Sequence, residues 1–136
     1  MLNKVQLIGN LGKDPELRYT ASGTAVATFS LATSTKHKNK DGDFVEKTEW
    51  HNIVVWRQLA ELCSQFLHKG RLVFIEGKIQ TRSYDDRDGN KRYITEIIAD
   101  NVKFLEKNSK EGSSTHHQVS NHDDYWAEEY PLPSTL

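Results

Sequence analysis

The sequence predicts an all-β domain that contains one helix and is followed by a polar tail. Apolar and polar residues alternate in several segments up to about residue 105, which is the two-residue period of half-buried strands. One central segment changes to a helical period, and the apolar pattern stops after residue 106. Only 36% of the 136 residues are hydrophobic, so we expect a folded domain over residues 1–106 and a disordered tail over residues 107–136.

The first two predicted strands are separated by a break at Asp14-Pro15. The first covers residues 3–13, where Gly9 and Gly12 indicate a bend or a bulge. The pattern resumes over residues 17–35 around an interruption at Ala21-Ser22-Gly23, and we expect one long, curved second strand there.

A basic loop over residues 35–47 leads into the third predicted strand. The loop contains Asp41-Gly42, a strong hairpin signal, so we expect it to project between two long antiparallel strands. The third strand carries Trp50 and Trp56, which share a face about 20 Å apart at ~3.4 Å per residue. Alternation alone leaves open whether these two rings are in the core or exposed to bind an extended ligand.

Residues 59–67 place five side chains on one stripe of a three-turn helix: Leu59, Leu62, Cys63, Phe66 and Leu67. We expect Lys69-Gly70 to close this helix and the lone cysteine to be an inert core thiol. Residues 71–83 and 91–105 are the fourth and fifth strands, joined by a hairpin loop rich in Asp. Five strands with one helix between the third and fourth predict an OB-fold, a closed Greek-key barrel.

The charge distribution is asymmetric although the net charge of the whole chain is −1. All 18 Lys and Arg residues lie in residues 1–110, which carry a net charge of +4. Residues 111–136 carry five acids and no Lys or Arg, for a net charge of −5. A basic body with an acidic tail is common among proteins that bind nucleic acids.

Several other classes of function lack support in the sequence. We find no paired carboxylates beside a base and no rigid metal set, so we predict no enzyme, no cofactor and no metal. The polar tail contains three histidines, His116, His117 and His122. We interpret them as part of a solvated segment rather than as a metal site, because no rigid frame fixes a coordination geometry there. No apolar run of about 18 residues and no leader occur, so we expect no membrane association.

Several motifs resemble the family of bacterial single-stranded DNA-binding proteins. The resemblance covers residues 1–105 in order, and its clearest motifs are Asn3-Lys4-Val5, Gly9-Asn10-Leu11-Gly12-Lys13-Asp14-Pro15-Glu16, Thr48-Glu49-Trp50-His51, Ile75-Glu76-Gly77 and Arg92-Tyr93. It implies a non-enzymatic protein that coats and protects single-stranded DNA in replication, recombination and repair, in the cytoplasm at the nucleoid. The alternative is a primosome accessory protein or an RNA-binding OB-fold.

The resemblance also implies roles for individual residues. Base-stacking positions correspond to Trp50, Trp56, Tyr84 and His37, where His37 and Tyr84 replace larger aromatic side chains of the family. The candidates for phosphate contacts are Lys4, Lys13, Arg18, Lys36, Lys38, Lys69, Arg82 and Arg92.

The family resemblance further implies a homotetramer in which His51 lies at a subunit interface. Relatives end in acids and an apolar-Pro-Phe tip that docks onto replication and repair proteins, and the final residues here depart from that tip. Candidate partner-binding residues in the tail are Asp123, Asp124, Trp126, Glu128, Glu129, Tyr130 and Leu132.

Overall fold

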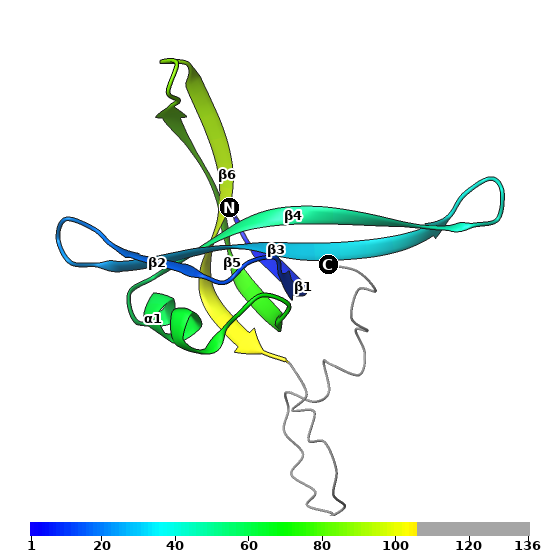
Figure 1. Ribbon diagram of the computed structural model, residues 1–136, viewed down its shortest axis with the longest axis horizontal. Helices are drawn as coiled ribbons and strands as arrows, with labels where there is room; N and C mark the ends of the chain where they lie inside the picture. The colour runs from blue at the N-terminus through cyan, green and yellow to red at the C-terminus, as the bar shows by residue number, and fades with distance from the viewer. Residues whose placement is uncertain (106–136) are drawn as a thin grey trace, which may run out of the picture.

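The computed structural model describes residues 1–105, which form six strand segments and one helix (Figure 1). The predicted tail over residues 107–136 lies outside the described residues. Within residues 1–105, no helix is long and apolar enough to cross a membrane. The elements are β1 (Val5–Leu11), β2 (Glu16–Tyr19), β3 (Ala25–Lys38), β4 (Phe44–Trp56), α1 (Arg57–Phe66), β5 (Leu72–Asp85) and β6 (Lys91–Phe104).

Five of the strands close into a barrel, which confirms the predicted OB-fold. The sheet order is β1-β5-β6-β4-β3-β2, and a further pairing between β1 and β3 closes the ring, while β2 flanks β3 outside it. The pairs are antiparallel except β4 with β6. Closure needs a close approach at Gly9, because a Cβ there would overlap the carbonyl of Ala32 on β3.

The core fills the interior of this barrel with the alternating apolar residues that the sequence predicts to face inward. Its largest fully buried side chains come from β1, β3, β4 and β5, together with α1 and the residue after β6: Leu11, Leu31, Ile53, Val55, Cys63, Val73, Ile75 and Leu105. The side chains pointing the other way along these strands are therefore free to form a binding surface.

The predicted second strand is wrong in one respect, because the interruption at residues 21–23 reverses the chain. The N–H of Gly23 donates to the carbonyl of Thr20 at 2.8 Å, and Gly23 has a φ of +84°. β2 and β3 therefore pair with each other as a hairpin, with Glu16 opposite Thr28. A tight turn explains the break better than curvature, because glycine readily adopts a positive φ.

The helix begins at Arg57 and ends earlier than predicted, at Phe66. Leu67 is extended and buried, so it leaves the helix to fill the core, and Gly70 belongs to the following turn. Phe66 is half exposed and its ring lies 6.3 Å from that of Phe104, so the predicted apolar stripe is only partly covered.

Two long hairpins project from the barrel in different directions, one made of β3 and β4 and the other of β5 and β6 (Figure 1). The predicted basic loop over residues 35–47 is mostly strand, because β3 and β4 stay paired out to Lys38 and Phe44. Only residues 39–43 form the turn. Because the strands extend this far, residues that the sequence predicts to be loop lie on a defined strand face.

Candidate nucleic-acid interface

A groove of about 690 Å³ runs across the outside of the barrel. Its walls come from β2 to β6, and even-numbered residues of the four long strands dominate its lining, as alternation requires for one face. The lining includes Lys13, Arg18, Val26, Thr28, Ser30, Asn52, Val54, Trp56, Gln80, Arg82, Ile94, Glu96 and Ile98. The groove thus combines an apolar floor, the large ring of Trp56 and charged groups of both signs.

The two strand tryptophans are exposed, which answers the question that alternation left open. Trp56 lines the groove and is 40% exposed, and Trp50 lies further along β4 toward the hairpin and is 55% exposed. Val54 shares their face but is buried in the groove floor. The expectation that both rings lie outside the barrel is therefore confirmed.

Gly12 supports the Trp50 ring, a role that the sequence pattern did not predict. A Cβ on Gly12 would overlap the far edge of the Trp50 indole and come within 2.7 Å of the Ser30 hydroxyl. The ring therefore lies directly against the backbone after β1. In the sequence Gly12 was a glycine within the first predicted strand, which indicated a bend or a bulge rather than a support for a ring.

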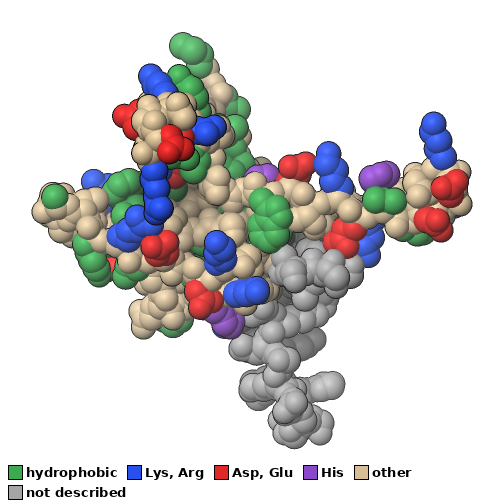
Figure 2. All heavy atoms as spheres, turned by 45° about the horizontal axis from the view of Figure 1, so that its top comes forward, with side chains coloured by type: hydrophobic (Ala, Val, Ile, Leu, Met, Phe, Trp, Pro, Cys, Tyr) green, Lys and Arg blue, Asp and Glu red, His purple; other side chains and the backbone are tan. Residues whose placement is uncertain are grey.

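Tyr84 reaches the same face from the other hairpin. It is 46% exposed, lies two residues beyond Arg82 on β5, and is paired across the hairpin with Arg92. Since cross-strand partners and residues two apart share a face, Tyr84, Arg82 and Arg92 point to the groove side. Figure 2 shows Lys and Arg side chains gathered over this hairpin, with acidic side chains among them.

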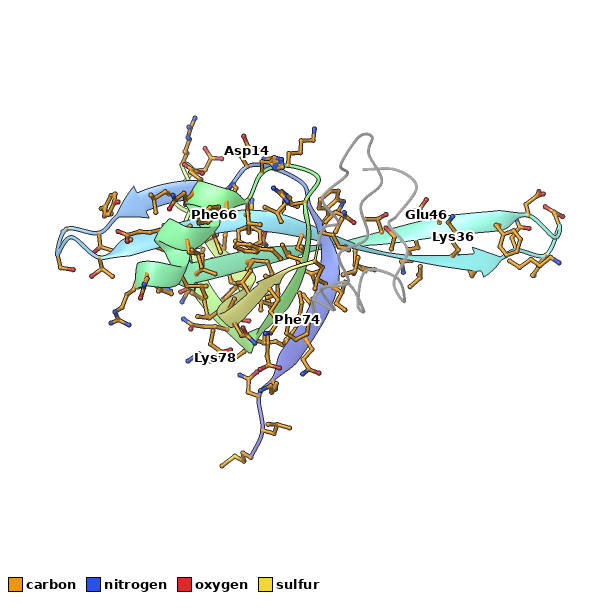
Figure 3. The ribbon with its side chains drawn as sticks, turned by 90° about the horizontal axis from the view of Figure 1, so that it is seen from below. Asp14, Lys36, Glu46, Phe66, Phe74 and Lys78 are labelled. Atoms are coloured by element: carbon orange, nitrogen blue, oxygen red, sulfur yellow. The ribbon has the colours of Figure 1, made fainter. Side chains whose placement is uncertain are left out.

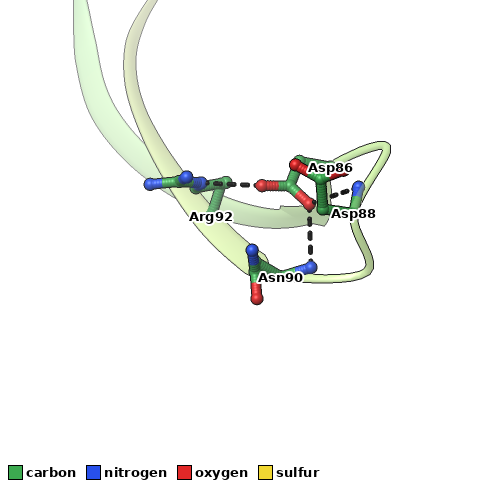
Figure 4. Close-up of polar contacts among 4 residues, drawn as sticks. All are labelled: Asp86, Asp88, Asn90 and Arg92. Atoms are coloured by element: carbon green, nitrogen blue, oxygen red, sulfur yellow. Dashed lines mark hydrogen bonds and ion pairs between the residues drawn. The ribbon is translucent and has the colours of Figure 1, made fainter.

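Asp86 fixes the turn of the β5–β6 hairpin and holds Arg92 (Figure 4). Its Oδ1 accepts the N–H groups of Asp88 and Asn90 at 3.0 and 2.8 Å, and its Oδ2 accepts the Nε–H of Arg92 at 3.0 Å. The Arg92 guanidinium, followed by the Asn90 N–H, lowers the pKa of the Asp86 carboxyl below its ordinary value.

Four of the eight candidate phosphate-binding cations are in ion pairs. The pairs are Lys4 with Glu76 at 3.0 Å, Arg18 with Glu16 at 3.0 Å, Arg82 with Glu96 at 2.5 Å, and Arg92 with Asp86 at 3.0 Å. The hydrogen bond from Gln6, followed by that from Lys4, lowers the pKa of Glu76. Lys4 is not among the residues that line the groove.

The other four candidates are available within the described part of the chain. Lys13, Lys36, Lys38 and Lys69 make no ion pair with any of residues 1–105. Lys69 is placed near the groove rim because its backbone N–H donates to Oδ1 of Asp14 at 2.8 Å. Lys36 and Lys38 are on the β3–β4 hairpin, away from the barrel.

The structure places His37 and His51 on the face of the β3–β4 hairpin opposite to the tryptophans. His37 pairs with Val45, and His51 pairs with Leu31, so both belong to the odd-numbered side. His51 Nε2 is 2.8 Å from the Thr33 hydroxyl, and partial burial lowers the His51 pKa, opposed by the charge of Glu49. His37 is therefore not brought together with the other predicted stacking residues.

Among residues 1–105, no three His, Cys, Asp or Glu side chains are grouped so that they could hold a metal ion. Cys63 is fully buried, and desolvation raises its pKa to about 12. This thiol is packed in the core as predicted, and such a pKa gives it no thiolate at neutral pH.

Comparisons with known proteins agree with this geometry. Residues 2–105 match the single-strand binding protein family. Single-stranded DNA-binding protein 1 of Chlorobaculum tepidum is 50% identical over 98% of this chain and 84% of its own length, and its namesake in Xylella fastidiosa is 46% identical over 92% and 96%. A solved Plasmodium falciparum SSB complex with ssDNA matches 78% of this chain and 97% of its own with a TM-score of 0.71 and 36% identity. The chain therefore belongs to the single-strand binding protein family.

Proposed function

We propose that this protein binds single-stranded DNA without reading its sequence, and that it coats and protects the strand during replication, recombination and repair. The observation that supports this most directly is the exposed aromatic face that runs from the groove onto both hairpins, with Lys and Arg side chains along it. The relatives that carry the name single-stranded DNA-binding protein make DNA the preferred ligand. The protein acts by binding rather than by catalysis.

Stacking on exposed rings provides the sequence-independent part of the binding. Trp50, Trp56 and Tyr84 offer flat surfaces on the groove side, and every base has a π face that can lie against them. His37 contacts a base only where the strand crosses to the opposite face of the β3–β4 hairpin.

Phosphate neutralisation provides the salt-dependent part. Lys13, Lys36, Lys38 and Lys69 contribute directly, because they need not leave an acidic partner among residues 1–105. Lys4, Arg18, Arg82 and Arg92 must exchange a carboxylate for a phosphate, so each adds less to the net binding free energy. Arg82 has the nearly buried Glu96 as its partner, so its exchange is the most costly of the four.

The protein assembles as a homotetramer, and it works in the cytoplasm at the nucleoid. His51 contributes to a subunit contact through the odd-numbered face of β4, where Thr33 and Glu49 surround it. In this arrangement one face of the hairpin serves assembly and the other serves DNA.

The acidic tail competes with DNA and recruits proteins of replication and repair. Residues 111–136 have a net charge of −5 against +3 for residues 1–105, so a tethered tail is attracted to the basic surface. The residues that would contact protein partners are Asp123, Asp124, Trp126, Glu128, Glu129, Tyr130 and Leu132.

A fluorescence titration with oligo-dT at several salt concentrations, with light scattering for mass, tests the proposal. We expect tight binding with strong tryptophan quenching, and log K should fall linearly with log salt concentration. Oligo-rU of the same length is the matched probe for the RNA-binding alternative. Tighter binding of rU than of dT, or no quenching by dT, would overturn the proposed function.

A further inference from the structure

Phe44, the first residue of β4, is a large apolar side chain with no place in the predicted site. It is 76% exposed, more than any other aromatic side chain in residues 1–105. It lies beside the turn of the β3–β4 hairpin, opposite Lys38. A phenylalanine this exposed at the end of a projecting hairpin gains nothing from the core, so its ring is available for contact with another molecule.

The strand geometry puts Phe44 on the same face as the two tryptophans. β3 and β4 pair without a bulge from Val26 opposite Trp56 to Lys38 opposite Phe44. Even spacing along an unbroken strand preserves the face, and Phe44, Trp50 and Trp56 are each six residues apart. At ~3.4 Å per residue, three rings therefore follow one another at intervals of about 20 Å along a single strand.

The charges beside Phe44 suit an anionic backbone. Lys38 lies directly across the hairpin from Phe44, and Lys36 lies two residues nearer the barrel on the same face. Figure 3 shows Lys36 and Glu46 next to each other on this hairpin, and they are cross-strand partners. On this strand face two lysines stand against one carboxylate. With the turn acids Asp41 and Asp43 included, residues 36–47 still carry a net charge of +1.

We infer that Phe44 is a further base-stacking residue, which extends the track for single-stranded DNA from Trp56 and Trp50 out to the end of the β3–β4 hairpin. The inference rests on the proposed function. The group that stacks on Phe44 is a nucleobase of the bound DNA strand, and the phosphates next to that base lie beside Lys36 and Lys38. The neighbouring Val45, which is 39% exposed on the opposite face together with His37, has no part in this track.

The test compares Phe44→Ala with Val45→Ala in the full-length protein, titrated with oligo-dT of graded length. We expect Phe44→Ala to weaken binding of long oligonucleotides about five- to tenfold, because one stacked base is lost. The slope of log K against log salt should stay unchanged, since no cation is removed, whereas Lys38→Ala should lower it by about 0.7. Phe44→Trp should restore the affinity, and Val45→Ala should bind as the wild type does.

Several results would overturn the inference. These are a Phe44→Ala variant within twofold of wild type at every length, an equal loss in Val45→Ala, or a change in oligomer mass that makes Phe44 a subunit contact. Thermal unfolding of each variant checks that the hairpin change leaves the barrel intact. If wild-type protein itself fails to bind oligo-dT, the proposed function fails, which is a different result from the loss of one stacking position.

Discussion

The two projecting hairpins end in turns of the same design, although their sequences differ. In residues 39–43 and in residues 86–90, the side-chain Oδ1 of the first residue accepts the N–H groups of the third and fifth residues. Gly42 and Gly89 occupy the fourth position with φ of +84° and +77°. Both turns therefore have their geometry fixed by one side-chain oxygen and one glycine.

The difference between them is the charge of that first residue. Asn39 is neutral, and the position six residues later is Val45, whereas Asp86 is anionic and the residue six positions later is Arg92, which it binds. The β5–β6 hairpin thus neutralises a cation beside Tyr84. The β3–β4 hairpin leaves Lys36 and Lys38 without an ion pair among residues 1–105, so the two hairpins differ in how much positive charge they keep available for DNA.

Both hairpins extend one aromatic face, and removing its rings should have the largest effect. We expect Trp50→Ala and Trp56→Ala each to weaken oligo-dT binding by ~1–3 kcal/mol while the barrel stays folded, because both rings are exposed. Binding is measured by titration and folding by circular dichroism. Ile79→Ala is the control, since Ile79 is 49% exposed on the reverse face of β5. Unfolding of both tryptophan variants would contradict the exposed placement.

The reverse face of the β3–β4 hairpin should serve assembly, and His51→Tyr tests this. A bulkier ring in a packed subunit contact causes strain of ~1–3 kcal/mol per copy, so the mass should shift toward monomer on dilution. Light scattering over a concentration series measures the shift, with His37→Tyr on the same face as the matched control. A variant that remains tetrameric at low micromolar concentration would remove His51 from the interface.

Exchanging the charge of the two turns tests the comparison directly. Asp86→Asn keeps the Oδ1 acceptor but releases Arg92, so we expect oligo-dT binding to tighten about two- to threefold with a steeper salt slope. Asn39→Asp places an anion near Lys38 and should weaken binding by a similar factor. Titration at three salt concentrations measures both. Changes of the same sign in the two variants would mean that turn charge does not control affinity.

The smallest expected effect is a difference in acid sensitivity between the turns. Arg92 lowers the pKa of Asp86, so the ionised Asp86 carboxylate stabilises the folded turn. This stabilisation is fully present above the ordinary pKa of 3.8 and is lost as the pH falls through the lowered pKa. The Gly89 amide should shift in an NMR titration over that pH range, and Asp86→Asn should abolish the change. Asn39 does not titrate, so its turn lacks this contribution. A Gly89 signal that is insensitive to acid would contradict the arrangement.

Periodicity was sufficient to predict the barrel, because each buried strand face must alternate. It gave the five-stranded closure, the position of the helix and the burial of Cys63. It was wrong at residues 21–23, where a chain reversal and a bend have the same sequence signal. The helix end was misplaced because the packing of Leu67, rather than the glycine at position 70, ends the helix.

The site was predicted only where a side chain's type reveals its role. Trp50 and Trp56 stood out as large aromatics in one strand, but the support that Gly12 gives Trp50 depends on a contact between distant segments. Phe44 was missed because polar residues around Asp41-Gly42 indicated a loop, whereas strand pairing continues to the turn. Its signal was present as a six-residue interval before Trp50.

The unbroken pairing of β3 with β4 also limits how this hairpin can change in length. Inserting or deleting one residue between Phe44 and Trp50 would move Phe44 to the opposite face, because the side-chain period of a strand is two. Adding two residues to each strand would avoid this reversal, and each such addition would lengthen the hairpin by about 7 Å. Variation in hairpin length should therefore occur in steps of two residues per strand, and an engineered hairpin should follow the same rule.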